Sequence, residues 1–171
     1  MRTRMCYLSG FFYYIHTALF TFVGPLIPIT LLLAMPWTLR LENMKLIVPS
    51  LIYAALIFPM WHRCPYRLEA WAIRMMYGWA HTFAIWDSLR RRRLEWRPTG
   101  SSAGRNIDKA RRFWIGIALW GGATALVWVG AALWRMATID AADYALVLSA
   151  GLFYAAIVGR VLVQPRNDEV A

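Results

Sequence analysis

The chain has 171 residues, of which 60% are hydrophobic and only 16% are charged, and it contains 10 tryptophans. Soluble domains carry nearer a quarter of charged residues and seldom contain several apolar runs long enough to cross a bilayer, so this composition indicates an integral membrane protein. The formal charge of +10 does not indicate a nucleic-acid partner. The basic residues cluster at the ends of apolar segments, and no known nucleic-acid-reading module surrounds them.

The first predicted span lies in an uncharged stretch, residues 7–39, with aromatic residues near both ends. About 20 residues suffice to cross a bilayer, so this segment is long, tilted or broken. Gly24-Pro25 and Pro28 supply the break, because each proline removes a backbone donor and crowds the preceding turn. His16 is notable within the span: it either faces a bundle interior or is a neutral imidazole bonded to a neighbouring helix.

A short polar connection, residues 40–45, leads to the second predicted span, residues 46–61. Residues 1–62 are therefore interpreted as a first transmembrane hairpin. The third and fourth predicted spans are residues 113–134 and 141–163, which form a second hairpin within residues 113–171. On the last span, small residues recur every fourth position and predict a ridge for close helix packing: Gly151, Ala155 and Gly159.

Residues 66–93 predict a different kind of helix. Polar residues recur at every seventh position: Arg67, Arg74, His81 and Ser88. Bulky apolar residues fall on another side, which is typical of an amphipathic helix lying in the plane of the membrane interface. The rival interpretation, a fifth span, would place several ionisable groups in the bilayer at a cost of about 2.5–3.5 kcal/mol per central charge.

The distribution of charge independently favours the in-plane helix. With four spans and both termini in the cytoplasm, only Arg40, Lys45 and Arg135 of the 19 Lys and Arg residues fall on the outer side, as the positive-inside rule requires. The sequence thus predicts an all-α, multi-pass protein of the plasma (inner) membrane. The predicted protein has four transmembrane helices and one interfacial helix, and its partner is the lipid bilayer.

The segment between the two hairpins, residues 63–112, contains the chain's most distinctive loop. Arg90 to Arg93 are followed by Trp96, Arg97 and Thr99. The arginines alone are explained by contact with anionic lipid headgroups. A tryptophan in a polar loop suits a sugar ring or a base, and Arg97 offers a planar fork for phosphate oxygens. The alternative is an interfacial tryptophan that anchors the loop to headgroups.

Other ionisable residues give weaker signals. Asp87 lies away from the polar stripe of the interfacial helix, so it is either a functional group or the partner of a salt bridge to Arg90 or Arg91. The three histidines and two cysteines fit no metal-ligand spacing, and we predict no metal site in this chain. No catalytic triad and no phosphate-binding glycine-rich loop is present in the sequence.

Residues 77–89, Tyr-Gly-Trp-Ala-His-Thr-Phe-Ala-Ile-Trp-Asp-Ser-Leu, followed by Trp-Arg-Pro-Thr-Gly at 96–100, resemble the C-terminal membrane region of processive family-2 glycosyltransferases. This is the cellulose-synthase-like group. Residues 6–14, Cys-Tyr-Leu-Ser-Gly-Phe-Phe-Tyr-Tyr, also resemble the start of that family's first span after the catalytic domain. The resemblance covers essentially the whole chain and has the order of elements that the charges predict.

The resemblance implies the membrane channel and gating loop of a polysaccharide-synthesising enzyme. In that family a cytosolic domain transfers sugars from a nucleotide-sugar, and the loop after the interfacial helix closes over the nucleotide. Trp96, Arg97 and Thr99 would accordingly contact the donor, with Tyr77, His81 and Asp87 in support. The whole enzyme would use a nucleotide-sugar and a divalent metal such as Mg, with a catalytic domain in cis or in trans and a polysaccharide chain as partners.

The chain departs from the family pattern in two ways. Ser101 stands where the cellulose-synthase loop has a lysine, and the catalytic aspartates and Gln-x-x-Arg-Trp motif are missing, because the only glutamine is Gln164. By resemblance the chain is a fragment or a split subunit, without catalytic residues and inactive alone. The alternatives are a non-enzymatic four-span scaffold that docks acidic partners through its arginines, and, less favoured because no internal repeat is visible, a small transporter.

Overall fold

A computed structural model of the chain describes residues 2–61, 67–90 and 107–163, and every element in these ranges is helical. Three helical segments are long and apolar enough to cross a membrane: Gly10–Ala34, Arg111–Thr138 and Ala141–Val163. The prediction of an all-α protein with membrane-spanning helices is confirmed in this form.

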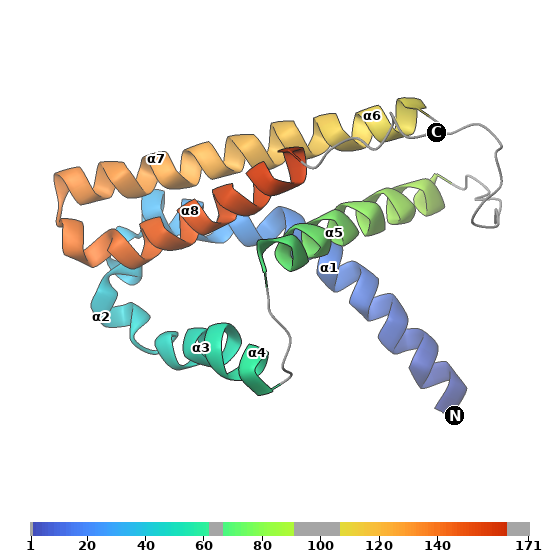
Figure 1. The fold of residues 1–171 in the computed structure, drawn as a ribbon, viewed down its shortest axis with the longest axis horizontal. Helices are drawn as coiled ribbons and strands as arrows, with labels where there is room; N and C mark the ends of the chain where they lie inside the picture. The colour runs from blue at the N-terminus through green and yellow to red at the C-terminus, as the bar shows by residue number, and fades with distance from the viewer. Residues whose placement is uncertain (1, 62–66, 91–106, 164–171) are drawn as a thin grey trace.

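Helix α1 (Arg2–Ala34) contains the first of these segments and runs through both Pro25 and Pro28. Figure 1 shows its N-terminal part slanting away from the bundle, while its C-terminal part lies along the other long helices. The prolines bend the helix and do not end it, because neighbouring turns and packed helices compensate for the two missing backbone donors. Pro25 itself is buried.

The connection after α1 is helical, unlike the simple polar link that the sequence predicts. It consists of a 3-10 turn, η1 (Pro36–Leu39), and one turn of α-helix, α2 (Leu41–Met44). Two of the predicted outer arginines lie at this end of the bundle. Arg135 donates hydrogen bonds to the carbonyls of Leu32 and Leu33 at 2.8 and 3.0 Å, and Arg40 pairs with Asp143 at 3.5 Å. The C-terminal carbonyls of α1 are thereby satisfied by a cation.

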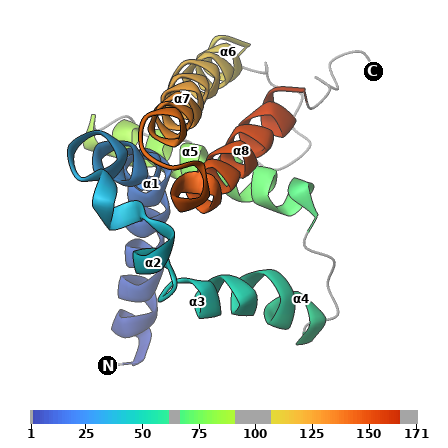
Figure 2. The ribbon, with the colours of Figure 1, turned by 90° about the vertical axis from the view of Figure 1, so that its left-hand side faces the viewer.

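The predicted second span takes an unusual form. Residues 48–61 are helical in three short pieces, α3 (Val48–Ile52), the π turn η2 (Tyr53–Ile57) and α4 (Phe58–Trp61). At 1.5 Å per residue this stretch is about 21 Å long, against a hydrocarbon core of about 30 Å. It stands away from the other helices in Figure 2 and is not among the three candidate spans.

The second hairpin is a long pair of helices. One continuous helix is formed by α6 (Ile107–Gly116), the π turn η3 (Ile117–Gly121) and α7 (Gly122–Thr138), and it packs along α8 (Ala141–Val163). The predicted small-residue ridge on α8 is used only in part. Gly151 is buried with the Trp128 ring against it, whereas a Cβ at Gly159 would meet nothing within 4 Å.

Helix α5 (Leu68–Leu89) corresponds to the predicted interfacial helix and is not among the candidate spans. It contacts both α1 and α8, and Figures 1 and 2 together show it crossing them obliquely. A core cluster joins it to the second hairpin through four buried side chains: Ala72, Trp79, Ile117 and Val161. This crossing positions the polar groups described next.

Candidate functional site

The crossing of α5 over α1 depends on a glycine. Gly78 is buried, and a Cβ built on it would overlap the Thr21 hydroxyl and lie 3.2 Å from the Thr17 carbonyl oxygen. Only a residue without a side chain lets the two backbones approach this closely. The close approach brings Thr17 and Thr21 of α1 next to α5 because position 78 has no side-chain atoms.

His81 is the centre of a polar and aromatic cluster at this crossing. Its Nδ1 atom lies 2.6 Å from the Thr17 hydroxyl oxygen. Tyr14 approaches the imidazole edge-on with ring centroids 4.4 Å apart, Tyr13 does so at 5.8 Å, and Tyr77 stacks on it at 6.2 Å. The imidazole is therefore fixed in orientation by contacts from both α1 and α5.

The hydrogen bonds around Thr17 favour one tautomer of His81. The Thr17 hydroxyl lies 3.0 Å from the carbonyl oxygens of both Tyr13 and Tyr14, and it has a single proton to donate. When that proton goes to a carbonyl, the Thr17 oxygen accepts, and Nδ1–H of His81 is the donor. This arrangement leaves the Nε2 atom as the acceptor of the neutral ring.

A second set of contacts joins α5 to the start of the second hairpin. The Trp79 side chain is buried, lies 4.9 Å from the Phe22 ring between centroids, and covers Gly116, where a Cβ would come within 2.9 Å of it. Phe83 continues the contact to Phe113 at 5.9 Å. Both faces of α5 are thus held, one by α1 and the other by α6 and η3.

The N-terminal end of α5 is tied to the C-terminal end of α8 by an ion pair. The Arg160 guanidinium lies 3.3 Å from the Glu69 carboxylate. The pKa of Glu69 is lowered, chiefly by a hydrogen bond from its own backbone N–H in the first turn of α5. Desolvation partly opposes this effect, and the charge of Arg160 adds to it. The carboxylate is consequently ionised at neutral pH.

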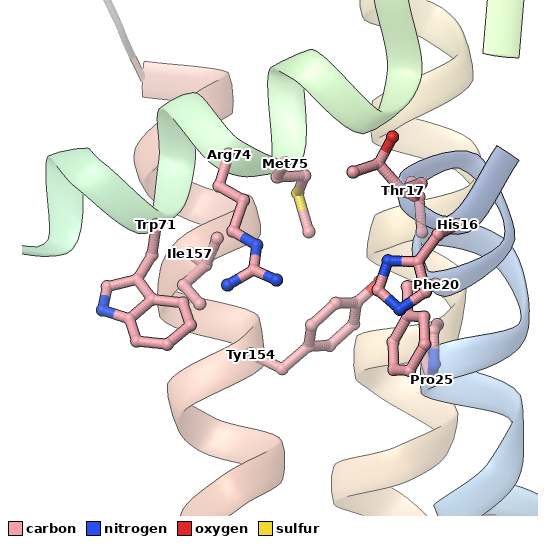
Figure 3. A pocket seen from close by; sticks show the side chains of 10 residues that line it. His16, Thr17, Phe20, Pro25, Trp71, Arg74, Met75, Tyr154 and Ile157 are labelled. Atoms are coloured by element: carbon pink, nitrogen blue, oxygen red, sulfur yellow. The ribbon is translucent and has the colours of Figure 1, made fainter. Parts of the chain in front are cut away.

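A cavity of about 290 Å³ lies where α1, α5 and α8 meet. Figure 3 shows the Arg74 and Trp71 side chains reaching into it from α5, Tyr154 from α8, and His16 with Phe20 from α1. The Tyr154 hydroxyl is 3.0 Å from the Thr124 hydroxyl, so its polar end is already engaged with α7. The cavity combines one cation and several aromatic rings in a largely apolar wall.

The predicted site residues have different outcomes. Trp96, Arg97 and Thr99 lie outside the described residues. Tyr77 and His81 are brought together in the cluster around Thr17. Asp87 lies farther along α5, partly exposed and two turns from His81, and it does not belong to that cluster.

Sequence reasoning missed three residues that the structure places in the site: Thr17, Trp71 and Tyr154. Nothing in the spacing of these residues signals their meeting, since each comes from a different helix. Arg74 and His81 were both visible as members of the polar stripe on α5, and His16 as an ionisable group in the first span. The structure divides them, placing His81 in the cluster and Arg74 with His16 in the cavity.

The described part of the chain contains no group of three or more His, Cys, Asp or Glu side chains that would hold a metal ion. The polar groups at the crossing are threonine and tyrosine hydroxyls, the imidazoles of His81 and His16, and the Arg74 guanidinium. Such a set binds by hydrogen bonds and by attraction to anions.

Comparison with models of protein families, with curated proteins and with solved structures gives no match in any of the three.

Proposed function

We propose that the chain is the membrane-channel and gating portion of a polysaccharide-synthesising glycosyltransferase that uses a nucleotide-sugar donor. It works with a catalytic domain supplied in cis or in trans and is inactive alone. The observation that carries the proposal is α5, which contains the stretch from Tyr77 to Leu89 quoted for the resemblance. This helix is clamped across α1 and α8 and ends at Leu89, just before the basic loop.

A clamped α5 is what a gating loop needs at its base. A loop that closes over a donor works only if its attachment point is fixed, since a shift of about 1 Å in position costs catalytic rate. In this proposal Trp96 stacks on the donor, Arg97 contacts phosphate oxygens, and Thr99 adds a hydroxyl. Tyr77 and His81 act as positioning residues through their contacts with α1, and the catalytic domain's divalent metal, such as Mg, completes the site.

The proposal includes four spans in the plasma (inner) membrane with both termini in the cytoplasm. Residues 46–61 cross as the second span beside a neighbour that compensates for their short length. The basic loop then faces the cytoplasm with most of the positive charge, as the positive-inside rule requires. At the opposite end of the bundle Arg40 pairs with Asp143 and Arg135 binds the Leu32 carbonyl, and both arginines fall on the outer side in this proposal.

The test is polymer synthesis by the whole enzyme that carries this membrane region. The double change Trp96→Ala with Thr99→Ala is expected to lower the rate of sugar incorporation by at least tenfold, because stacking and donor contacts are lost. Trp134→Ala, an exposed tryptophan at the other end of α7, is the matched control and retains the rate. Unchanged synthesis in the double variant contradicts the gating role.

A second candidate, a non-enzymatic scaffold subunit, is favoured by one observation. Residues 48–61 stand off the bundle with large apolar side chains exposed, including Met60 and Trp61. Such a segment offers a packing surface for another membrane helix. A stable complex between the whole chain and a protein that lacks any glycosyltransferase domain would favour this candidate.

A further inference from the structure

Arg74 is an exposed cation and the charged side chain among those that line the cavity between α1, α5 and α8. Its guanidinium points into the cavity in Figure 3, and it makes no ion pair or hydrogen bond with any residue in the described ranges. His16 reaches toward the same space from α1. A guanidinium in a partly apolar cavity attracts an anion that brings two oxygens in one plane, as a phosphate does.

The surroundings of the cavity indicate where that anion is attached. Ile157 lines the cavity on α8, and one turn beyond it Arg160 pairs with Glu69. This ion pair marks the level at which charged groups emerge from the apolar part of the bundle. Phe20 lines the cavity from α1, and the exposed ring of Phe153 on α8 lies edge-on to the cavity-lining Trp71, with ring centroids 5.6 Å apart. A molecule in this position meets the Arg74 guanidinium together with aromatic and aliphatic side chains.

The volume of the cavity is sufficient for a lipid headgroup. At about 290 Å³ the cavity is at the lower limit of ordinary ligand pockets. A glycerophosphate group occupies such a volume, while acyl chains must lie outside it along α1 and α8. A second cavity, of about 360 Å³ between α1 and α5, gives the contrast, because none of the residues that line it is charged. These residues are Ala18, Thr82, Phe83, Ile85, Trp86 and Leu89.

We propose that this cavity binds the phosphate-bearing headgroup of an anionic membrane phospholipid, with Arg74 forking onto the phosphate oxygens and His16 adding a hydrogen bond. The acyl chains run along the exposed apolar surfaces of α1 and α8. The bound lipid fills the gap beneath α5 and joins the three helices at the membrane interface. This site is separate from the loop proposed to gate sugar transfer and does not depend on that role.

The test is a titration of the purified whole chain in neutral detergent with phosphatidylglycerol, measured by native mass spectrometry. Arg74→Gln is expected to weaken binding about five- to tenfold, as removal of one interfacial charge predicts. Arg74→Lys keeps the charge and restores part of the affinity. Arg112→Gln, an exposed cation on α6 outside the cavity, is the matched control and leaves binding unchanged.

Two further probes identify the source of the phosphate. Diacylglycerol with the same chains tests the need for the headgroup, and inorganic phosphate tests the need for the chains. The proposal predicts that diacylglycerol binds more weakly than phosphatidylglycerol and that millimolar inorganic phosphate does not displace the lipid. Equal binding by wild type and Arg74→Gln, equal binding of diacylglycerol, or displacement by inorganic phosphate would each overturn it.

Discussion

At the scale of single residues, Gly78 sets how closely α5 lies on α1. The two helices are held in contact by a position where any side chain would meet Thr21 and the Thr17 carbonyl. The same approach allows the 2.6 Å contact between His81 and Thr17. One glycine therefore controls both the packing of the crossing and the polar cluster within it.

Gly78→Ala is expected to destabilise the protein by about 1–3 kcal/mol, the usual cost of forcing a methyl group into a packed contact. Gly130→Ala is the matched control, because a Cβ there meets nothing within 4 Å. The control gains helix stability, about 0.5–1 kcal/mol. Thermal unfolding in detergent, followed by circular dichroism, measures both; equal midpoints for the two variants would contradict the close crossing.

Glu69 predicts a pH dependence for the attachment of α5 to α8. Since its pKa is lowered in the folded protein, its contribution to stability is present above the ordinary carboxylate pKa. That contribution is lost as the pH falls through the lowered value, where the carboxylate protonates and releases Arg160. We expect hydrogen exchange in the first turns of α5 to rise in acid in the wild type.

Glu69→Gln removes the titrating group while keeping its shape. Its exchange in the first turns of α5 should already be raised at neutral pH and should change less on acidification than in the wild type. Asp143, paired with Arg40 at the other end of the bundle, supplies the comparison through Asp143→Asn. If Glu69→Gln retained the full acid response at α5, another carboxylate would be responsible.

At the scale of elements, the sequence predicts the bounds of some helices, and for others it predicts a helix but not where the helix begins and ends. The predicted fourth span, residues 141–163, coincides with α8, because an uninterrupted apolar run follows Asp140 and only Asp143 and Arg160 carry charge within it. The predicted amphipathic helix is present as α5, shorter at both ends. Strong periodicity and long apolar runs are the signals that single sequences carry best.

Other elements escaped prediction for physical reasons. The helical turns after α1 are held by a contact that is distant in sequence, since the Tyr144 hydroxyl donates a hydrogen bond to the Pro36 carbonyl, 108 positions away. The π turns of η2 and η3 are not indicated by the periodicity of the sequence. The contact between Thr17 and His81 joins residues 64 positions apart, which periodicity along one helix does not reveal.

The orientation of α5 in the bilayer yields a prediction at this scale. Spin labels placed singly at exposed positions Ile73, Tyr77, Ala80 and Ala84 should report similar, shallow depths, because their spacing of three or four residues puts them on one face of α5. Collision rates with oxygen and with a soluble nickel complex measure the depth. A steady rise and fall of depth from one end of α5 to the other would instead make it a membrane-crossing helix.

At the scale of the whole molecule, the charges at the two ends of the bundle differ in use. Arg40 and Arg135 are bound to Asp143 and to the end of α1, and Arg160 is paired with Glu69, whereas Arg74 forms no ion pair among the described residues. The described helices form a bundle with α5 across one half of it (Figure 1).

The measurement that tests the sugar-transfer proposal most directly is affinity capture of the tagged whole chain from its native membrane. The captured material is assayed for transfer of labelled sugar from nucleotide-sugars into polymer, and its proteins are identified. We predict a polypeptide with the catalytic aspartates and Gln-x-x-Arg-Trp motif, fused to or bound by this chain, and polymer synthesis that requires it. Capture of a stable complex without such a domain and without sugar transfer would contradict the proposal.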